Sequence, residues 1–123
     1  MALPTLKPVS RKYAWAHMLD VSNPSSAFTV APCKGQIMKA FSVISVALTG
    51  TNSNFTMKIN GTLIPGMAWV VTQAGSAAGD VDSATPTARA TSRVNEGDTI
   101  EFITDGASST TSPTTCCVEI EMD

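Results

Sequence analysis

The stretch Asn54-Phe-Thr-Met-Lys-Ile-Asn-Gly-Thr-Leu-Ile64 decides the fold class of this 123-residue chain. Its Phe, Met and first Ile alternate with Thr and Lys, so the apolar side chains share one face of an extended segment. This period of two predicts a β-strand with one buried face. The Asn60-Gly61 pair that follows readily adopts the positive φ angles of a two-residue turn. The stretch therefore predicts a β-hairpin.

Short alternating apolar segments, each closed by a turn signal, continue from Phe28 to Met122 without a helical period. Besides the hairpin, we expect strands over residues 12–19, 27–31, 36–49, 67–72, 85–93, 99–103 and 116–122. Turn signals recur about every ten residues, which is typical of a two-sheet sandwich. The expected fold is all-β, a two-sheet jelly-roll-like sandwich of about eight strands. The segment 73–84 is expected to be a polar loop.

The longest apolar stretch, residues 36–49, has apolar side chains on both parities. Ile37 and Phe41 belong to one parity, whereas Ile44 and Leu48 belong to the other. A β-bulge adds one residue to a strand and exchanges its two faces. We therefore expect either one long strand with a bulge or two strands in this region.

Aromatic residues are few, and most are expected in the core. The four Phe residues and Trp69 fall on predicted strand faces. Tyr13 and Trp15 share one face of the first predicted strand, and packing against the sandwich is the expected role because large aromatic side chains mostly point inward. A sugar-stacking platform or a subunit contact is the alternative role for this pair.

Residues 1–12 are expected to form an extended N-terminal arm, followed by a sandwich domain over residues 13–123. Pro4 and Pro8 exclude a helix and favour extended backbone. Leu3, Leu6 and Val9 make the arm partly apolar, and its Lys and Arg residues make it basic. A segment of this kind is either disordered or bound to another surface.

Charge is unevenly distributed along the chain. Residues 1–79 carry six Lys or Arg and one acid, whereas residues 80–123 carry two Arg and nine acids, so the halves have charges of +5 and −7. In a sandwich the two halves interleave, and the split would then disappear in space. No continuous basic surface interleaved with aromatic residues is indicated, so we expect no nucleic-acid partner.

Cysteine usage indicates a reducing compartment. Cys33, Cys116 and Cys117 form an odd set with an adjacent pair, which is a poor disulfide framework, and we expect all three to be reduced. Cys116 and Cys117 should point to opposite faces of the last strand. Residues 1–12 lack the apolar core of a signal peptide, and no run is long enough to span a membrane. We expect a protein that is made and kept in a reducing cytoplasm, or that leaves it by cell lysis.

The residues that would carry catalysis or metal binding do not form a recognisable set. His17 is the single histidine and has no nucleophile in a suitable context. No Cys and His spacing suits zinc, and Asp80 and Asp82 lack the later bidentate acid of a calcium loop. We therefore expect no enzyme activity, no metal and no cofactor.

Several segments resemble the small jelly-roll proteins of tailed-bacteriophage capsids. The resemblance rests on Gly-Gln-Ile-Met-Lys-Ala-Phe-Ser-Val at 35–43, Phe-Thr-Met-Lys-Ile-Asn-Gly-Thr at 55–62, Arg-Val-Asn-Glu-Gly-Asp-Thr-Ile at 93–100 and Cys-Val-Glu-Ile-Glu at 117–121. Members of this group decorate the outer capsid surface as cement proteins and clamp neighbouring major capsid subunits. The resemblance implies that role here, with a location on the virion and a homo-dimer or homo-trimer as the assembly.

The expected contact residues for the capsid or a neighbouring subunit are Leu3, Pro4, Leu6, Lys7, Pro8, Arg11, Lys12, Tyr13 and Trp15. An extended arm of this composition suits strand addition on a neighbour. The rival hypothesis is a carbohydrate- or receptor-binding module of a phage tail or fibre. It would use Tyr13, Trp15 and the polar loops 73–84 and 104–115.

Overall fold

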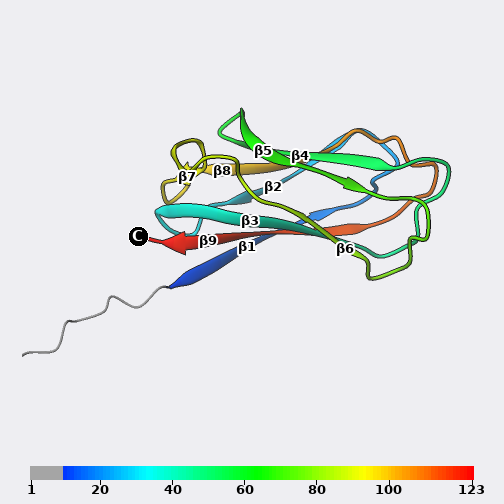
Figure 1. Ribbon diagram of the computed structural model, residues 1–123, viewed down its shortest axis with the longest axis horizontal. Coiled ribbons are helices and arrows are strands. Elements are labelled where there is room, and N and C mark those ends of the chain that lie inside the picture. The colour runs from blue at the N-terminus through cyan, green and yellow to red at the C-terminus, as the bar shows by residue number, and fades with distance from the viewer. Residues whose placement is uncertain (1–9) are drawn as a thin grey trace, which may run out of the picture.

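The strands of this chain form two antiparallel sheets packed face to face. The computed structural model describes residues 10–123. Its elements are β1 (Arg11–Met18), β2 (Ser25–Val30), β3 (Gly35–Ile44), β4 (Ser53–Ile59), β5 (Thr62–Val71), β6 (Val81–Ala84), the 3₁₀ turn η1 (Arg89–Thr91), β7 (Arg93–Val94), β8 (Thr99–Thr104) and β9 (Thr114–Met122). Figure 1 shows β3, β9 and β1 in one layer and β2, β8, β4 and β5 in the other.

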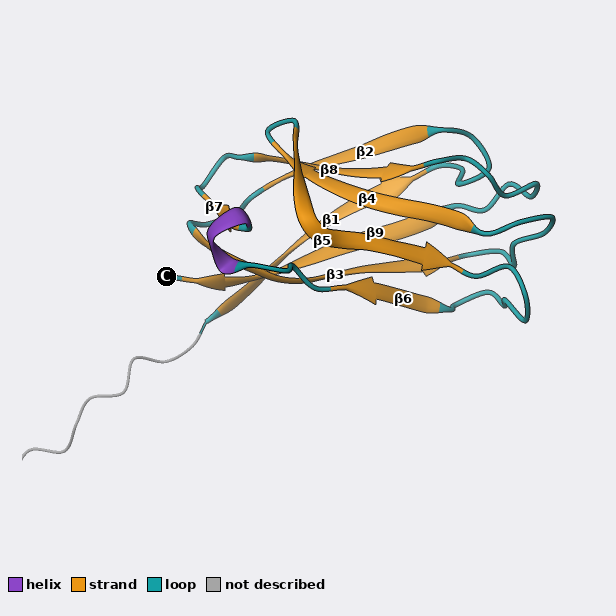
Figure 2. Ribbon diagram, turned by 45° about the horizontal axis from the view of Figure 1, so that its top comes forward, coloured by secondary structure: helices purple, strands orange, loops and turns teal. Residues whose placement is uncertain are grey.

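The strand order is that of a long hairpin wrapped into a jelly roll. One sheet has the order β1-β9-β3-β6, with β7 also paired to β3, and the other has the order β2-β8-β4-β5. Strand β1 therefore pairs with β9, β2 with β8, β3 with β6 and β4 with β5, all antiparallel. Figure 2 shows the two layers from a second direction. The expected all-β, two-sheet jelly-roll-like sandwich is confirmed.

The tip of the wrapped hairpin is the turn expected from the sequence. Ile59 lies opposite Thr62, so Asn60 and Gly61 form a two-residue loop. Their φ angles are 49° and 86°, the left-handed values that this turn requires. Phe55 is fully buried in the core, as the alternation of β4 predicted.

A bulge in β3 brings both parities of its sequence into the core. The register with β9 shifts between Ile37 and Lys39. Ile37 points inward before the shift, and Ala40 and Ile44 point inward after it. Because of the shift, Phe41 lies on the outer face, half-buried rather than in the core. The expected bulge is confirmed, and the expected place of Phe41 is wrong.

Phe28 is a second aromatic residue whose expected place was wrong. Its neighbour Ala27 is buried in the core, so Phe28 points away from it and is 61% exposed. Phe55, Phe102 and Trp69 are buried as expected, and the Trp69 indole N–H donates a 2.9 Å hydrogen bond to the Ser42 hydroxyl.

Two short elements differ from the expected outline. Strand β6 lies within the expected loop 73–84, and it has no buried residue that could have produced an alternating pattern. The 3₁₀ turn η1 interrupts the expected extended segment 85–93. Strand β6 forms by pairing with β3 and contributes only the partly buried Ala84 to the core, and η1 has no buried residue. Neither element therefore has a clear apolar periodicity.

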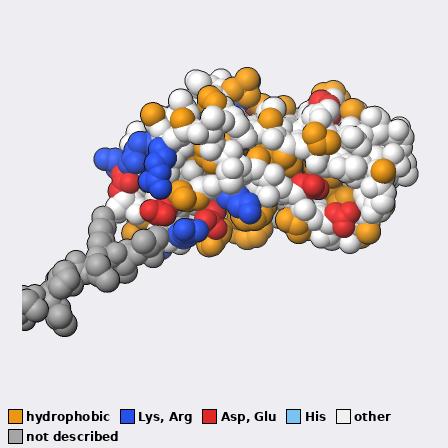
Figure 3. All heavy atoms as spheres, in the orientation of Figure 1, with side chains coloured by type: hydrophobic (Ala, Val, Ile, Leu, Met, Phe, Trp, Pro, Cys, Tyr) orange, Lys and Arg blue, Asp and Glu red, His pale blue; other side chains and the backbone are white. Residues whose placement is uncertain are grey.

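The charge split along the sequence does not persist in space. Arg11 from the basic half pairs with Glu119 and Glu121 from the acidic half. Arg93 forms an ion pair with Asp123. Figure 3 shows Lys and Arg side chains next to Asp and Glu side chains at the end of the sandwich where β1 begins. The interleaving follows from the pairing of the first strand with the last.

Candidate functional site

Tyr13 and Trp15 point away from the core, contrary to the expectation that they pack inward. They are 50% and 61% exposed. The alternate residues of β1, Ala14, Ala16 and Met18, are the buried ones. Because successive strand residues point to opposite faces, the odd-numbered side chains of β1 lie on the outer face of the sheet. The geometry therefore leaves the pair accessible for the alternative roles, a sugar-stacking platform or a subunit contact.

Strand register extends this aromatic pair into a continuous apolar surface. Trp15 lies opposite Cys117 of β9, and Cys117 lies opposite Phe41 of β3. One row further along the strands, Val43 of β3 lies opposite Val81 of β6. These side chains enclose a groove of about 280 Å³, hereafter the apolar groove, lined by Tyr13, Trp15, Phe41, Val43, Val81, Thr115 and Cys117.

Charged residues border one end of the apolar groove. The Arg11 guanidinium lies 2.6 Å from a Glu119 carboxylate oxygen and 3.7 Å from one of Glu121. The Tyr13 hydroxyl donates a 3.2 Å hydrogen bond to Glu119, and the negative charge of Glu119 raises the pKa of Tyr13. On β3, the Lys39 ammonium lies 5.1 Å from the centre of the Phe41 ring. The end of the groove therefore carries both signs of charge.

Cys117 forms part of the floor of the groove. It points outward while Cys116 points into the core, as the sequence predicted, yet Cys117 is only 4% exposed. Burial raises the pKa of its thiol to about 11, and burial raises that of Cys116 to about 12. Cys33, Cys116 and Cys117 are all buried and unbridged. The apolar side chains around Cys117 thus exclude water from an outer-face position.

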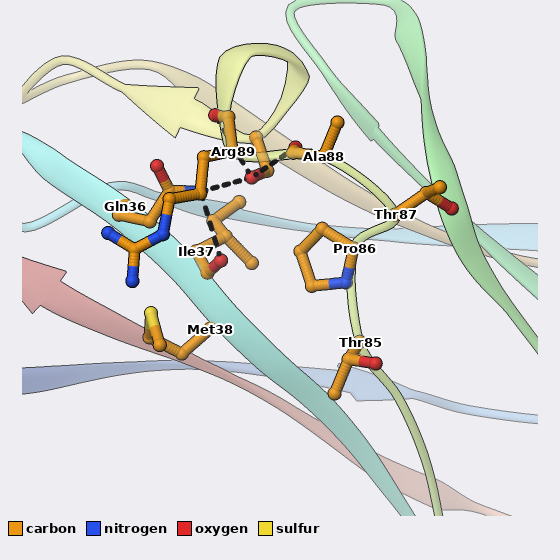
Figure 4. A pocket seen from close by; sticks show the side chains of 9 residues that line it. Gln36, Ile37, Met38, Thr85, Pro86, Thr87, Ala88 and Arg89 are labelled. Carbon is orange, nitrogen blue, oxygen red and sulfur yellow. Dashed lines mark hydrogen bonds between the residues drawn. The ribbon is translucent and has the colours of Figure 1, made fainter.

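A second pocket, of about 300 Å³, lies between β3 and the segment that leads into η1 (Figure 4). The Gln36 amide N–H donates to the Ser92 hydroxyl and, at 3.4 Å, to the Ile37 carbonyl. Its amide oxygen is buried without a hydrogen-bond partner among the described residues. Figure 4 shows the Arg89 guanidinium lying along β3 beside Gln36. This pocket shares no lining residue with the apolar groove.

The structure brings part of the predicted contact set together. Leu3, Pro4, Leu6, Lys7 and Pro8 lie outside the described residues. Arg11 and Lys12, assigned to the arm from the sequence, belong to β1 instead, because they pair with Glu121 and Ile120 of β9.

Arg11, Tyr13 and Trp15 share the outer face, whereas Lys12 points to the other side of the strand. Sequence reasoning missed Phe41, Val43, Val81 and Cys117 as members of the same surface. The bulge in β3 was the signal for Phe41 and Val43, since it exchanges the two faces after residue 38.

Metal-ligating clusters and membrane-spanning helices are not found among the described residues. Residues 10–123 contain no group of three His, Cys, Asp or Glu side chains that could hold a metal ion. His17 lies on the exposed face of β1, opposite Thr115. No helix within the described range has the length and apolar character needed to cross a membrane.

Comparison with known proteins identifies a shared fold but no family. No family model matches the chain, and no curated protein matches its sequence. Among solved structures, the chain is similar to one titled "Cyanophage Pam1 capsid asymmetric unit", with a TM-score of 0.57, 11% identity, and coverage of 100% of this chain and 93% of that chain.

Two further similarities are weaker. A structure of Desmodium yellow mottle tymovirus matches with a TM-score of 0.42 and 5% identity, over 99% of this chain and 93% of that chain. A Bacillus endospore appendage pilin matches with a TM-score of 0.42 and 16% identity, over 100% and 96%. With TM-scores this low, neither similarity shows a shared fold. The chain is therefore similar in fold, along its whole length, to a chain of a cyanophage capsid.

Proposed function

We propose that this chain is a bacteriophage head decoration (cement) protein, which binds the outer surface of the capsid and stabilises contacts between major capsid protein subunits. The observation that carries the proposal is the match to a chain of a capsid asymmetric unit, which covers all of this chain and 93% of the other. The matched chain is thus of similar length to this one. The proposed role is binding, without catalysis.

The apolar groove supplies the surface for such binding. Protein interfaces combine an apolar centre with a polar rim, and they are enriched in Trp, Tyr and Arg. The groove is lined by Trp15 and Phe41, and Arg11 with its acidic partners lies at one end. Contiguous exposed apolar surface of this kind is typical of interaction sites.

The mechanism is mass action. A protein that binds only the assembled shell stabilises that state by RT ln(1 + [L]/Kd), about 2.7 kcal/mol per site at a free concentration of 100 Kd. Many such sites on one shell add their contributions. The shell then resists disassembly without any chemical step.

The N-terminal arm is proposed as a second contact with the shell or a neighbouring protomer. This part rests on the composition of Leu3, Pro4, Leu6, Lys7 and Pro8. Deletion of residues 2–9 leaves β1 intact, because β1 begins at Arg11. We expect the truncated chain to fold normally and to occupy capsids less than the full chain. Undiminished occupancy would contradict a role for the arm.

Exposed Trp15 also favours the rival hypothesis of a sugar-binding module, since sugars stack on such rings. Sugar recognition additionally requires polar groups convergent on the ligand. In the apolar groove the Tyr13 hydroxyl is already bonded to Glu119, and Thr115 is the remaining hydroxyl. The groove therefore fits an apolar protein surface better. Hits on a glycan array that disappear with Trp15→Ala would support the sugar-binding hypothesis instead.

The copy number of this chain in purified virions tests the proposed function. Quantitative mass spectrometry would compare it with the major capsid protein. A cement protein is expected in numbers comparable to the shell subunits. A few copies per particle would indicate a location in the tail and favour the receptor-binding hypothesis. Absence from particles would overturn both the cement and the receptor-binding hypotheses.

A further inference from the structure

Strand β1 has a free edge whose hydrogen-bonding groups can be identified. The Ser10 carbonyl accepts a 2.8 Å hydrogen bond from the Met122 N–H, in register with the β1–β9 ladder. In an antiparallel pair, residues alternate between pointing both backbone groups at the partner and pointing both away. Even-numbered residues of β1 therefore face β9. The N–H and C=O groups of the odd-numbered residues point to the free edge, and no described residue pairs with them.

This edge is the longest uninterrupted one in the described part of the sandwich. β1 has eight residues, with neither Pro nor Gly and no register shift against β9. The opposite edge of the same sheet is β6, which has four residues. In the other sheet, the edge strand β5 is interrupted by Pro65 and Gly66. β2 is uninterrupted but has six residues. Short strands and prolines are common ways to protect an edge from pairing, and β1 has neither.

The same residues that offer free backbone groups carry the exposed aromatic side chains. No described residue pairs with the edge groups of Tyr13 and Trp15, and the side chains of both residues stand on the outer face beside the apolar groove. A strand added at this edge would satisfy the backbone groups and would also cover one side of both aromatic rings. Unpaired backbone groups and exposed aromatic surface thus coincide at one place in the fold.

A second copy of β1 is a partner that fits this edge by symmetry. A two-fold axis perpendicular to the sheet makes the two strands antiparallel and keeps both cores on the same side of the joined sheet. Directly opposite residues then point to the same face, so odd-numbered residues of one copy meet odd-numbered residues of the other. These are the residues with free N–H and C=O groups on both strands. The pattern is therefore self-complementary.

Charge also favours the antiparallel arrangement. Arg11 and Lys12 are both at the beginning of β1. Antiparallel pairing places Arg11 and Lys12 of the two copies at opposite ends of the joined strands. Each pair of cations then lies beside the end of the partner strand that contains His17. Parallel pairing would bring four cations together, which is unfavourable.

We propose that two copies of this chain form a dimer by antiparallel pairing of their β1 strands, with Trp15 close to the two-fold axis. The inference concerns the isolated chain and does not depend on the proposed function. Both apolar grooves then lie on one side of a continuous sheet, with Tyr13 and Trp15 of each copy between them. The two Ser10 residues lie at opposite ends of the joined strands.

Sedimentation of the purified full-length chain over a range of concentrations tests the dimer. We expect a monomer–dimer equilibrium for the natural sequence. His17→Pro removes one free edge N–H without removing a bond of the monomer, and Trp15→Lys opposes two like charges near the axis. Both variants are expected to sediment as folded monomers. The control Phe28→Lys changes an equally exposed aromatic residue on the edge strand of the other sheet, and it should keep the dimer.

Amide hydrogen exchange provides a readout specific to edge pairing. In the dimer, the N–H groups of Tyr13, Trp15 and His17 should exchange slowly, and in Trp15→Lys they should exchange as exposed amides. Three results would overturn the proposal: a natural chain that is monomeric at all concentrations, a trimer, or a dimer that persists in both β1 variants. Loss of the dimer in Phe28→Lys alone would overturn it in favour of β2.

Discussion

The outer faces of the two sheets differ in how their exposed apolar residues are arranged. On the β1-β9-β3-β6 sheet, Trp15, Cys117 and Phe41 follow one another across three adjacent strands. On the β2-β8-β4-β5 sheet, the corresponding row begins with Phe28 and ends with Leu63, but Glu101 and Lys58 separate them. Each sheet thus carries apolar side chains on its outer face, and in the β1-β9-β3-β6 sheet this row is not broken by a charged residue.

This difference shows that the exposure of a single residue does not identify a contiguous apolar surface. Trp15 and Phe28 are each 61% exposed. Isolated exposed apolar residues are common on soluble proteins, whereas contiguous ones mark interaction surfaces. The strand register, and not the degree of exposure, separates the candidate interface from the solvated face.

The largest expected effect is on capsid binding by Trp15→Lys. A central aromatic residue of an interface commonly contributes at least 2 kcal/mol, which corresponds to a loss of about thirtyfold in affinity. We expect this loss when the purified variant is titrated onto shells that lack the protein, with bound chain measured by cosedimentation.

Phe28→Lys is the matched control for this measurement. It introduces the same charge at a site of equal exposure, flanked by Glu101 instead of Cys117. Binding within about twofold of the natural chain is expected. If Phe28→Lys weakened binding as much as Trp15→Lys, the distinction between the two faces would be lost.

A smaller effect concerns the adjacent thiols on the two sides of β9. An unfolded Cys has a pKa of about 8.5, whereas burial raises Cys117 to about 11 and Cys116 to about 12. The folded state therefore holds these protons more tightly. Their contribution to stability is complete below pH 8.5 and is lost as the pH rises through the folded values.

Urea unfolding at about pH 8 and about pH 10 measures this loss. We expect Cys117→Ser and Cys116→Ser each to reduce the fall in unfolding free energy between the two pH values. A Cys117 thiol open to solvent would titrate near the unfolded value. A Cys117→Ser variant with the same pH dependence as the natural chain would therefore show that the outer face does not exclude water.

The smallest expected effect is that of Arg11→Ala on stability. Arg11 is partly exposed, and exposed ion pairs contribute about 0–1 kcal/mol. Thermal unfolding at low salt should show a small decrease in Tm, which shrinks as salt screens the pair. Arg89→Ala, whose guanidinium forms no ion pair with a described residue, should show no such salt dependence. Equal salt dependence in both variants would contradict the ion pairs of Arg11 with Glu119 and Glu121.

Much of the fold was predictable because it depends on local signals. The alternation of β4 and the Asn60-Gly61 pair gave the central hairpin, and turn residues gave most strand ends. The change of parity in residues 36–49 correctly indicated a bulge. These features are decided by backbone preference and by which side chains are buried.

The candidate surface was predictable only in part, because it depends on pairing between distant strands. In β1 the buried residues are Ala14, Ala16 and Met18, although the larger aromatic residues lie on the other face of the strand. The meeting of Trp15 with Cys117 and Phe41 requires the register of β1, β9 and β3. No segment of the sequence taken alone contains that register.

Oxidative footprinting of the protein in virions and in its free form tests the central claim, that one outer face is the interface and the other faces solvent. The account predicts that oxidation of Trp15, Tyr13 and Phe41 is lower in the particle than in the free chain, while oxidation of Phe28 is unchanged. Protection of Phe28 with undiminished oxidation of Trp15 and Phe41 would contradict it.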